Sequence, residues 1–420
     1  MKKSNVPLSV FGLGKLGSVI AALSAQAGHR TIGVDLDTRI VNAINTGLSP
    51  FEEPGLAAVI QAAKEHLSAT TDGVSAVINT EVSVIIVPTP SRTDGSFSNE
   101  FVANAMRVIG TAAAKKSSRH TVIVSSTVRP GSLDGELKDV LEDASGLKVG
   151  EDIGLAYNPA FIALGSIISD MRNPDMLLIG ESDPEAGDLV LDLAKGYLKV
   201  APKVHRMSLI DAEITKIAVN TFVTTKISFA NMLSELCDFI PNSDVHTITK
   251  ALGDDTRIGS KYLRAATGYG GPCFPRDNRA LREFGDSVGV KMSIAEATDE
   301  VNDRQSARLI RQIASSVTPP GKIAILGITY KPSTSVVDDS PGVQLANELK
   351  ALEYEVVVSD PMGLELARPL LDPGILLQKD FRRAIKGAEL VAILTPWSEY
   401  ESLQLPESVK LVDPWFVLPD

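Results

Sequence analysis

The stretch that most constrains the fold lies near the N-terminus, where a short strand, a glycine-rich turn and a helix are predicted in succession. The apolar residues Leu8 to Phe11 run directly into Gly12-x-Gly14-x-x-Gly17, and an alanine-rich helical segment follows. A second strand, Thr31 to Val34, ends at Asp35. A glycine pattern alone is weak evidence, but this context is typical of the first βαβ unit of a doubly wound sheet that binds a dinucleotide.

The residues of this unit also predict which dinucleotide binds. The glycines would admit the pyrophosphate to the N-terminus of the helix, where amide N–H groups and the helix dipole favour negative charge. Asp35 would accept hydrogen bonds from a ribose, and its charge would repel a 2′-phosphate, so NAD is favoured over NADP. The alternative is a glycine-rich turn that holds no ligand. The predicted cofactor contacts are Gly12, Gly14, Lys15, Leu16, Gly17, Asp35, Arg39, Thr89 and Thr127.

Hydroxyl side chains follow two later strands of the same predicted sheet. The strand Val82 to Val87 ends next to Thr89, and the strand Thr121 to Ser125 ends next to Ser126 and Thr127. In doubly wound sheets the ligand lies beyond the carboxyl ends of the strands, so these hydroxyls are expected near a cofactor or substrate. Serine and threonine are also common helix caps, and for Ser126 a cap is at least as good an interpretation.

The composition limits the class of protein and its partners. A chain of 420 residues with 44% hydrophobic content is long enough for two or three domains. The net charge of -11 argues against a nucleic acid or an anionic membrane as partner, and an anionic ligand would need locally gathered cations. Cys237 and Cys273 make no disulfide framework, and no stretch reaches transmembrane length. We therefore expect a soluble, cytoplasmic protein.

A long helix is predicted from Ser208 to about Asp238. Lys216 and Asn220 are four residues apart in it, so they share one face and could together stabilise a developing oxyanion. The alternative is that both side chains are merely solvated. Apolar residues lie on more than one face of this segment, which predicts a helix buried between domains or between subunits.

A cysteine lies in the glycine- and proline-rich stretch from Gly268 to Asp277. The glycines allow a tight bend and the close approach of a ligand. Arg276 would favour the thiolate of Cys273, which is the form that attacks carbonyl carbons. The alternative is a free cysteine that fills a small space in the core.

A second α/β pattern begins after the Pro319-Pro320 boundary. Strands are predicted at Lys322 to Leu326, Val356 to Val358 and Leu390 to Leu394, with a helix beginning at Ser340-Pro341. This smaller Rossmann-like unit has no GxGxxG, but its first loop carries Lys331, a candidate for binding phosphate. The predicted fold class is therefore α/β, with two Rossmann-like parallel-sheet domains joined by a long central helix and a helical middle region. The predicted domains are residues 1–200, 201–317 and 318–420.

Taken together, these motifs resemble the UDP-glucose/GDP-mannose (nucleotide-sugar) 6-dehydrogenase family, and most closely its UDP-glucose members. The resemblance covers nearly the whole chain and is carried by Gly12-x-Gly14-x-x-Gly17, Val87-Pro88-Thr89-Pro90, Ser126-Thr127-Val128, Asn158-Pro159, Asn173-Pro174-Asp175, Lys216-x-x-x-Asn220 and Gly270-Gly271-x-Cys273-x-x-x-Asp277. It implies oxidation of the C6 alcohol of a nucleotide sugar to a carboxylate, with NAD as cofactor and no metal. The implied substrate is UDP-glucose, and the implied assembly is a homodimer formed through the central helix.

The resemblance also implies a role for each catalytic residue. Cys273 would attack the C6 aldehyde to give a thiohemiacetal, and oxidation of that adduct gives a thioester that water cleaves. Lys216 and Asn220 would stabilise the charged oxygen at C6, while Asp277 would handle protons or position water. Thr127 would lie near the nicotinamide and the reacting carbon.

The implied substrate contacts are spread along the chain. They are Phe161, Ile162, Leu164, Lys216, Asn220, Arg257, Tyr262, Leu263, Tyr269, Gly270 and Lys331. Arg257 matches an arginine that reaches the site of the neighbouring subunit in this family.

Three positions depart from the family pattern. Ala160 and Leu164 stand where the family carries glutamates in one loop, and Asp338 aligns with a usual arginine. The first of these glutamates is associated with thioester hydrolysis in the family, so the departures bear on that step and on the identity of the sugar. The alternatives are a dehydrogenase for GDP-mannose or a UDP-hexosamine, and a non-catalytic protein that binds NAD or a nucleotide sugar.

Overall fold

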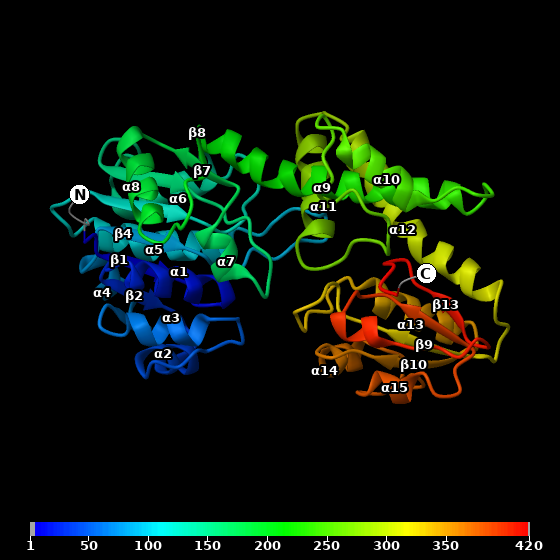
Figure 1. Cartoon of the computed structure of the whole chain (residues 1–420). Coiled ribbons are helices and arrows are strands. Elements are labelled where there is room, and N and C mark those ends of the chain that lie inside the picture. The colour runs from blue at the N-terminus through cyan, green and yellow to red at the C-terminus, as the bar shows by residue number, and fades with distance from the viewer. Residues whose placement is uncertain (1–4, 419–420) are drawn as a thin grey trace. The chain divides into compact units, whose positions relative to one another are not determined.

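The computed structural model describes residues 5–418 of the chain (Figure 1). The chain divides into two compact units, of which the first ends at Lys216 and the second begins at Ile217. This boundary falls within the long helix α9 (Leu209–Cys237). The presence of α9 confirms the helix that the sequence predicts for this part of the chain. Among the described residues, none of the helices has the length and apolar character of a membrane span.

The first unit is built on an eight-stranded sheet with the order β3-β2-β1-β4-β5-β6-β7-β8. Its strands are β1 (Leu8–Phe11), β2 (Thr31–Val34), β3 (Leu67–Thr70), β4 (Val82–Ile85), β5 (His120–Val124), β6 (Ile153–Tyr157), β7 (Met176–Glu181) and β8 (Lys203–Met207). All neighbours in the sheet are parallel except β6 and β7, which are antiparallel.

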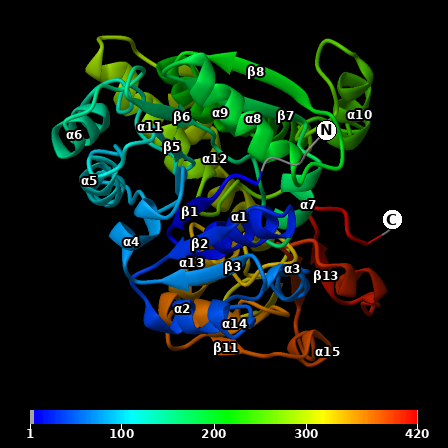
Figure 2. The same ribbon diagram turned by 90° about the vertical axis from the view of Figure 1, so that its left-hand side faces the viewer.

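Helices cover both faces of this sheet. They are α1 (Lys15–Gln26), α2 (Thr38–Asn45), α3 (Leu56–Ala63), α4 (Gly73–Ile78), α5 (Glu100–Ala113), α6 (Glu136–Ser145), α7 (Ile167–Arg172) and α8 (Pro184–Lys195). One apolar core contains side chains from α1, α3, α7 and α8. A separate core contains side chains from α4, α5, α6 and the start of α9, and Figure 2 shows α5 and α6 together beside β5. Two cores on opposite faces are what a doubly wound sheet requires.

The second unit contains a helical part and a smaller sheet. The helices are α10 (Val245–Asp254), α11 (Phe274–Ser287), α12 (Ser293–Ala314), α13 (Pro341–Ala351), α14 (Leu364–Ala367) and α15 (Phe381–Ala384), with short 3-10 turns at Arg368–Leu370 and Ser398–Ser402. The strands are β9 (Lys322–Leu326), β10 (Glu355–Ser359), β11 (Leu376–Leu377), β12 (Leu390–Ile393) and β13 (Lys410–Val412). They form a parallel sheet in the order β11-β10-β9-β12-β13, which confirms the predicted second Rossmann-like unit.

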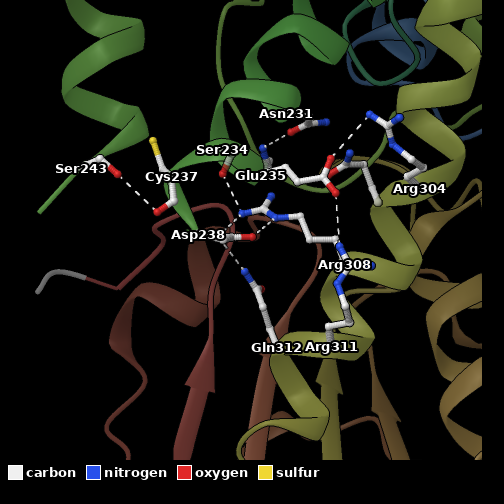
Figure 3. A network of polar contacts seen from close by, with 12 residues as sticks. Asn231, Ser234, Glu235, Cys237, Asp238, Ser243, Arg304, Arg308, Arg311 and Gln312 are labelled. Atoms are coloured by element: carbon white, nitrogen blue, oxygen red, sulfur yellow. Dashed lines mark hydrogen bonds and ion pairs between the residues drawn. The ribbon is translucent and has the colours of Figure 1, made fainter. Parts of the chain in front are cut away.

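A buried ion pair joins the end of α9 to α12. The guanidinium of Arg308 donates to both carboxylate oxygens of Asp238, at 2.6 and 2.8 Å, and to the hydroxyl of Ser234 at 2.8 Å. Figure 3 shows Arg308 between these partners, with Gln312 donating to the same carboxylate at 3.3 Å. The Arg308 side chain is only 7% exposed, so this network fixes α12 against α9 in the interior of the second unit.

Candidate active site

The glycine-rich turn between β1 and α1 leaves open space at the N-terminus of the helix. Gly12 has a φ of +91°, and a Cβ there would lie 2.4 Å from the Ile86 carbonyl oxygen. A Cβ on Gly17 would lie 1.9 Å from the carbonyl oxygen of Gly12. Around Gly14, by contrast, no other atom comes within 4 Å of where a Cβ would be. Two of the glycines therefore permit close backbone packing, and the middle one leaves room for a pyrophosphate.

The acid at the tip of β2 is held at the edge of this space. The carboxylate of Asp35 accepts hydrogen bonds from the backbone N–H of Leu13 at 2.7 Å and of Asp37 at 2.9 Å. A carboxylate has about four lone-pair sites, so two such bonds leave capacity for ribose hydroxyls. Arg39 instead forms an ion pair with Asp37 at 2.7 Å, and its side chain is 89% exposed. This neighbouring guanidinium lowers the pKa of Asp37 to about 2.

The hydroxyl residues after β4 and β5 meet at the carboxyl edge of the sheet. Ser126 Oγ accepts from the backbone N–H of Val87 at 2.9 Å and donates to the Val87 carbonyl oxygen at 2.8 Å. Thr89 Oγ1 donates to the carbonyl oxygen of Thr127 at 2.7 Å. The interpretation of Ser126 as a helix cap is wrong, because no helix begins there and its hydroxyl instead joins two strand ends.

Lys216, the last residue of the first unit, is a buried side chain. It is only 8% exposed, and its Nζ donates to the carbonyl oxygen of Ala160 at 3.0 Å and lies 4.6 Å from the centre of the Phe161 ring. The interpretation of this lysine as a solvated surface residue is therefore wrong. Ile162 and Leu164, from the same loop, pack against the core on the α1 side of the sheet. A cavity of about 70 Å³ lies against this loop, and Ala160 is one of its lining residues.

In the second unit, Cys273, Asp277 and Asn220 come together. Cys273 stands at the N-terminus of α11 and is exposed, so it is not a core filler, contrary to that alternative. The backbone N–H of Asp277 donates to the Cys273 carbonyl oxygen at 2.8 Å, and the buried Asp277 carboxylate accepts from Asn220 Nδ2 at 2.6 Å. Arg276 lies in the first turn, with its Nε 3.6 Å from Asp277. A helix N-terminus and a nearby cation both favour a thiolate.

The glycines before Cys273 pack tightly on the loop that follows β9. The backbone N–H of Gly271 donates to the Asp338 carbonyl oxygen at 2.9 Å. A Cβ on Gly271 would lie 2.5 Å from the Tyr330 ring, and one on Gly270 would lie 2.1 Å from the carbonyl oxygen of Asp339. Glycine is thus required at both positions, and the contact brings the loop carrying Lys331 to the Cys273 segment.

The remaining predicted substrate contacts of the second unit differ in burial: some side chains are buried and others are exposed. Tyr269 is buried, donates to Asp299 at 2.6 Å and accepts from Asn278 at 3.0 Å. Tyr262 is exposed, whereas Leu263 packs in a small core. The structure places Arg257 on the surface, paired with Asp255 at 2.6 Å.

Two residues that contact candidate site segments, one in each unit, were not predicted from the sequence. Tyr330 precedes the predicted Lys331, and its contact with Gly271 joins segments too distant in sequence for any local pattern to connect them. Glu213 lies one helical turn before Lys216, and that spacing was an available signal. No group of three or more His, Cys, Asp or Glu that could hold a metal is found between residues 5 and 418.

Comparison with known proteins gives the family. Three domain models of the UDP-glucose/GDP-mannose dehydrogenase family match in succession: the NAD binding domain over residues 6–198, the central domain over 210–304 and the UDP binding domain over 324–419. The first of these matches confirms NAD as the predicted cofactor.

Similar proteins include enzymes for two nucleotide sugars. The chain is 32% identical to a UDP-glucose 6-dehydrogenase of Haloferax volcanii, covering 94% of this chain and 92% of that one. It is 34% identical to a GDP-mannose 6-dehydrogenase of Pseudomonas aeruginosa, covering 86% and 82%. The solved structure of a UDP-glucose dehydrogenase from Pyrobaculum islandicum matches with a TM-score of 0.90 at 34% identity, over 99% of this chain and 95% of that one. The chain therefore belongs to the UDP-glucose/GDP-mannose dehydrogenase family.

Proposed function

We propose that this protein oxidises the C6 alcohol of UDP-glucose to the carboxylate, with Cys273 as the covalent nucleophile. The observation that carries the proposal is the exposed thiol at the start of α11, one helical turn from the buried Asp277–Asn220 pair. NAD, when bound, accepts a hydride in each of the two oxidations. The Gly14 space and the acid at the tip of β2 fit its pyrophosphate and ribose.

The proposed roles of the side chains follow from their chemistry. After the alcohol has lost a hydride and a proton, the Cys273 thiolate adds to the aldehyde carbon and its oxygen becomes negative. Lys216 and Asn220 donate hydrogen bonds to that oxygen. Loss of the second hydride gives a thioester, and attack by water releases the carboxylate and returns the thiol. Asp277, within one turn of the sulfur, takes the proton from that water.

Thr127 and the second-unit loops complete the proposed site. Thr127 is proposed to lie near the nicotinamide, because Thr89 holds its carbonyl oxygen at the carboxyl edge of the sheet. Lys331 is proposed to bind a phosphate of the nucleotide, since its loop packs on the Cys273 segment. The first-unit loop with Phe161, Ile162 and Leu164 is proposed to contact the sugar, and its carbonyl at Ala160 already holds the ammonium of Lys216.

A second candidate substrate is GDP-mannose, because a GDP-mannose 6-dehydrogenase is as similar to this chain as the UDP-glucose enzymes are. Purified protein with NAD+ and each of a panel of nucleotide sugars, followed by NADH absorbance, separates the two. We expect the highest kcat/KM with UDP-glucose. A preference for GDP-mannose would overturn the choice of substrate, and no turnover with any sugar would favour a non-catalytic binding protein.

We also propose a homodimer formed through α9. Phe222, Phe229 and Leu236 recur every seven residues along this helix and are 67%, 45% and 54% exposed. A seven-residue repeat places them in one apolar stripe. An exposed stripe of this kind on a soluble protein marks an interface, and the second copy of the chain is the partner that the family implies.

A further inference from the structure

A buried glutamate lies between the proposed catalytic segments of the first unit. Glu213, in the first turns of α9, is 0% exposed. One carboxylate oxygen accepts from the backbone N–H of Gly131 at 2.6 Å, and the other accepts from that of Leu133 at 2.9 Å. Both partners are about 80 residues away in sequence, so these are tertiary contacts and not a local turn. We call this pair of hydrogen bonds the Glu213 clamp.

The clamped segment is the one that carries Thr127. At its beginning, Ser126 and Thr127 are tied to the residues that follow β4. At its other end, Gly131 turns with a φ of +87° and Leu133 enters the core that α9 shares with α5 and α6. Thr127 therefore lies between two anchors, of which Glu213 supplies the second.

The same helix carries Lys216 three residues further on. Its ammonium holds the loop after β6 through the Ala160 carbonyl oxygen, so consecutive turns of α9 hold two different loops of the proposed site. A shift of the Thr127 segment on α9 would thus change the distance between Thr127 and Lys216, which have to act on the same carbon.

We propose that Glu213 is a positioning residue whose ionised carboxylate fixes Thr127 relative to Lys216. The inference rests on the proposed function, in which both residues face the C6 carbon. The carboxylate accepts from the two N–H groups with separate oxygens. Protonation turns one of those oxygens into a hydroxyl, a much weaker acceptor, so the hydrogen bond from the N–H that faces it is largely lost, and a buried N–H without a good partner costs free energy.

Glu213 is expected to take up a proton within the pH range in which the rate can be measured. Burial, with a smaller contribution from the charge of Asp134, raises the pKa of Glu213 to about 7, although the backbone N–H bonds oppose the shift. Other titratable or charged side chains on α9 and on the elements packed against its start are Arg129, Tyr157, Glu181, Arg206, Asp211 and Lys216. The clamp is complete above pH 7 and loses one bond below it, so the rate of hydride transfer should fall on the acid side.

The test uses Glu213→Gln in the full chain. Its amide keeps the size and one acceptor oxygen but points an N–H₂ at the second backbone N–H. We expect a folded protein in which hydrogen exchange over residues 127–133 is faster without any ligand. We also expect the rate of NADH formation in the first turnover, measured by rapid mixing, to fall by about tenfold or more, in line with the cost of misplaced reacting groups. The acid limb of that rate near pH 7 should disappear. The matched control is Glu142→Gln in α6. The Glu142 carboxylate also accepts from a backbone N–H, that of Val149 at 3.1 Å, and its substitution should change none of the three readouts.

Unchanged exchange over residues 127–133, or an unchanged acid limb in the Gln variant, would overturn the proposal. If Glu213→Gln does not fold, Glu213→Asp tests the same role. Aspartate keeps the charge but has a shorter reach, and we expect slower NADH formation in the first turnover with the acid limb retained. A first turnover at the wild-type rate would overturn the role of Glu213. Hydrogen exchange is measured without sugar, so it tests the clamp whether or not the protein turns over UDP-glucose. If the proposed function were wrong, the wild-type protein itself would show no turnover, and the two failures can therefore be told apart.

Discussion

The side-chain amide of Asn220 donates to the carboxylate of Asp277 at 2.6 Å, joining α9 to the helix that begins at the cysteine. Asp277 is only 1% exposed, and its own backbone N–H is bonded to the Cys273 carbonyl oxygen. This contact fixes which end of the amide is which, because only the nitrogen can donate to a carboxylate. One N–H of Asn220 is thereby used, and the other is the one that we propose donates to the oxygen formed on the substrate.

The first prediction concerns the thiol. Cys273→Ser should abolish carboxylate formation, because an alcohol at the same position lacks the nucleophilicity of a thiolate. Binding of NAD+ and UDP-glucose, measured by calorimetry, should be nearly unchanged. Cys237→Ser is the control, since Cys237 ends α9 and is not part of the proposed site. Wild-type turnover by the Cys273 variant would reduce this thiol to a packing role.

The second prediction concerns Lys216, which we propose as an oxyanion donor. Lys216→Ala should lower kcat by about 10²- to 10³-fold, the usual cost of removing one such donor. Lys195→Ala is the control, because Lys195 forms a surface pair with Asp192 and should leave kcat unchanged. Steady-state NADH formation measures both. A rate for Lys216→Ala within a factor of about two of the wild type would show that the ammonium only braces its loop.

Much of this site could be predicted because its signals are local. The turn between β1 and α1 needs glycine at given places, and Asp35 follows a strand, so both could be recognised in a short window. Lys216 and Asn220 could be paired because a helix has a fixed period. The burial of Lys216 could not be predicted, since it depends on a loop more than 50 residues earlier.

The strands that were missed share a physical cause. The sequence of β8, Lys-Val-His-Arg-Met, is polar and largely exposed at the edge of its sheet, so it lacks the apolar pattern of a buried strand. The edge strands β11 and β13 have only two and three residues, and the edge strand β3 is short and only half buried. Edge strands are defined by their neighbours, which a single sequence does not reveal.

The third prediction concerns stability of the second unit. Arg308→Ala should lower the free energy of unfolding by about 1–3 kcal/mol, because it removes two charge-assisted hydrogen bonds to Asp238, whose side chain is 28% exposed and keeps access to water. Arg368→Ala, in an exposed pair with Glu365, is the control and should cost about 0–1 kcal/mol. Denaturant unfolding followed by circular dichroism compares the two. Equal midpoints would mean that the network of Figure 3 contributes no more than a surface pair.

The fourth prediction concerns the apolar stripe on α9. We expect the wild-type chain to be a dimer by light scattering, and Phe229→Asp to shift it toward monomer by placing a charge in the stripe. The control is Phe101→Asp in α5, an exposed phenylalanine outside the stripe, which should stay dimeric. A monomeric wild-type protein, or a Phe229 variant that remains dimeric, would contradict the proposed interface.

The last prediction concerns Ala160, which stands where the family carries a glutamate. Ala160 supplies the carbonyl oxygen that holds Lys216 and also lines a cavity, but it brings no carboxylate to activate water. General-base assistance contributes about 10²- to 10⁴-fold, so hydrolysis of the thioester should be slow compared with the two hydride transfers. The covalent Cys273 adduct should then accumulate.

Rapid mixing of the protein with NAD+ and UDP-glucose should therefore give a burst of NADH followed by a slower steady state. Intact mass spectrometry should find the protein heavier by one acyl nucleotide sugar, and Cys273→Ser should abolish that adduct. Ala160→Glu should speed the steady state more than the burst, because the backbone carbonyl that holds Lys216 is retained while a base is added. Ala160→Gln is the matched control, since it has nearly the same size without a basic oxygen, and it should leave the steady state slow. An active enzyme with no burst and no adduct, whose turnover Ala160→Glu leaves unchanged, would contradict this prediction and show that Asp277 activates the water fully without a second carboxylate.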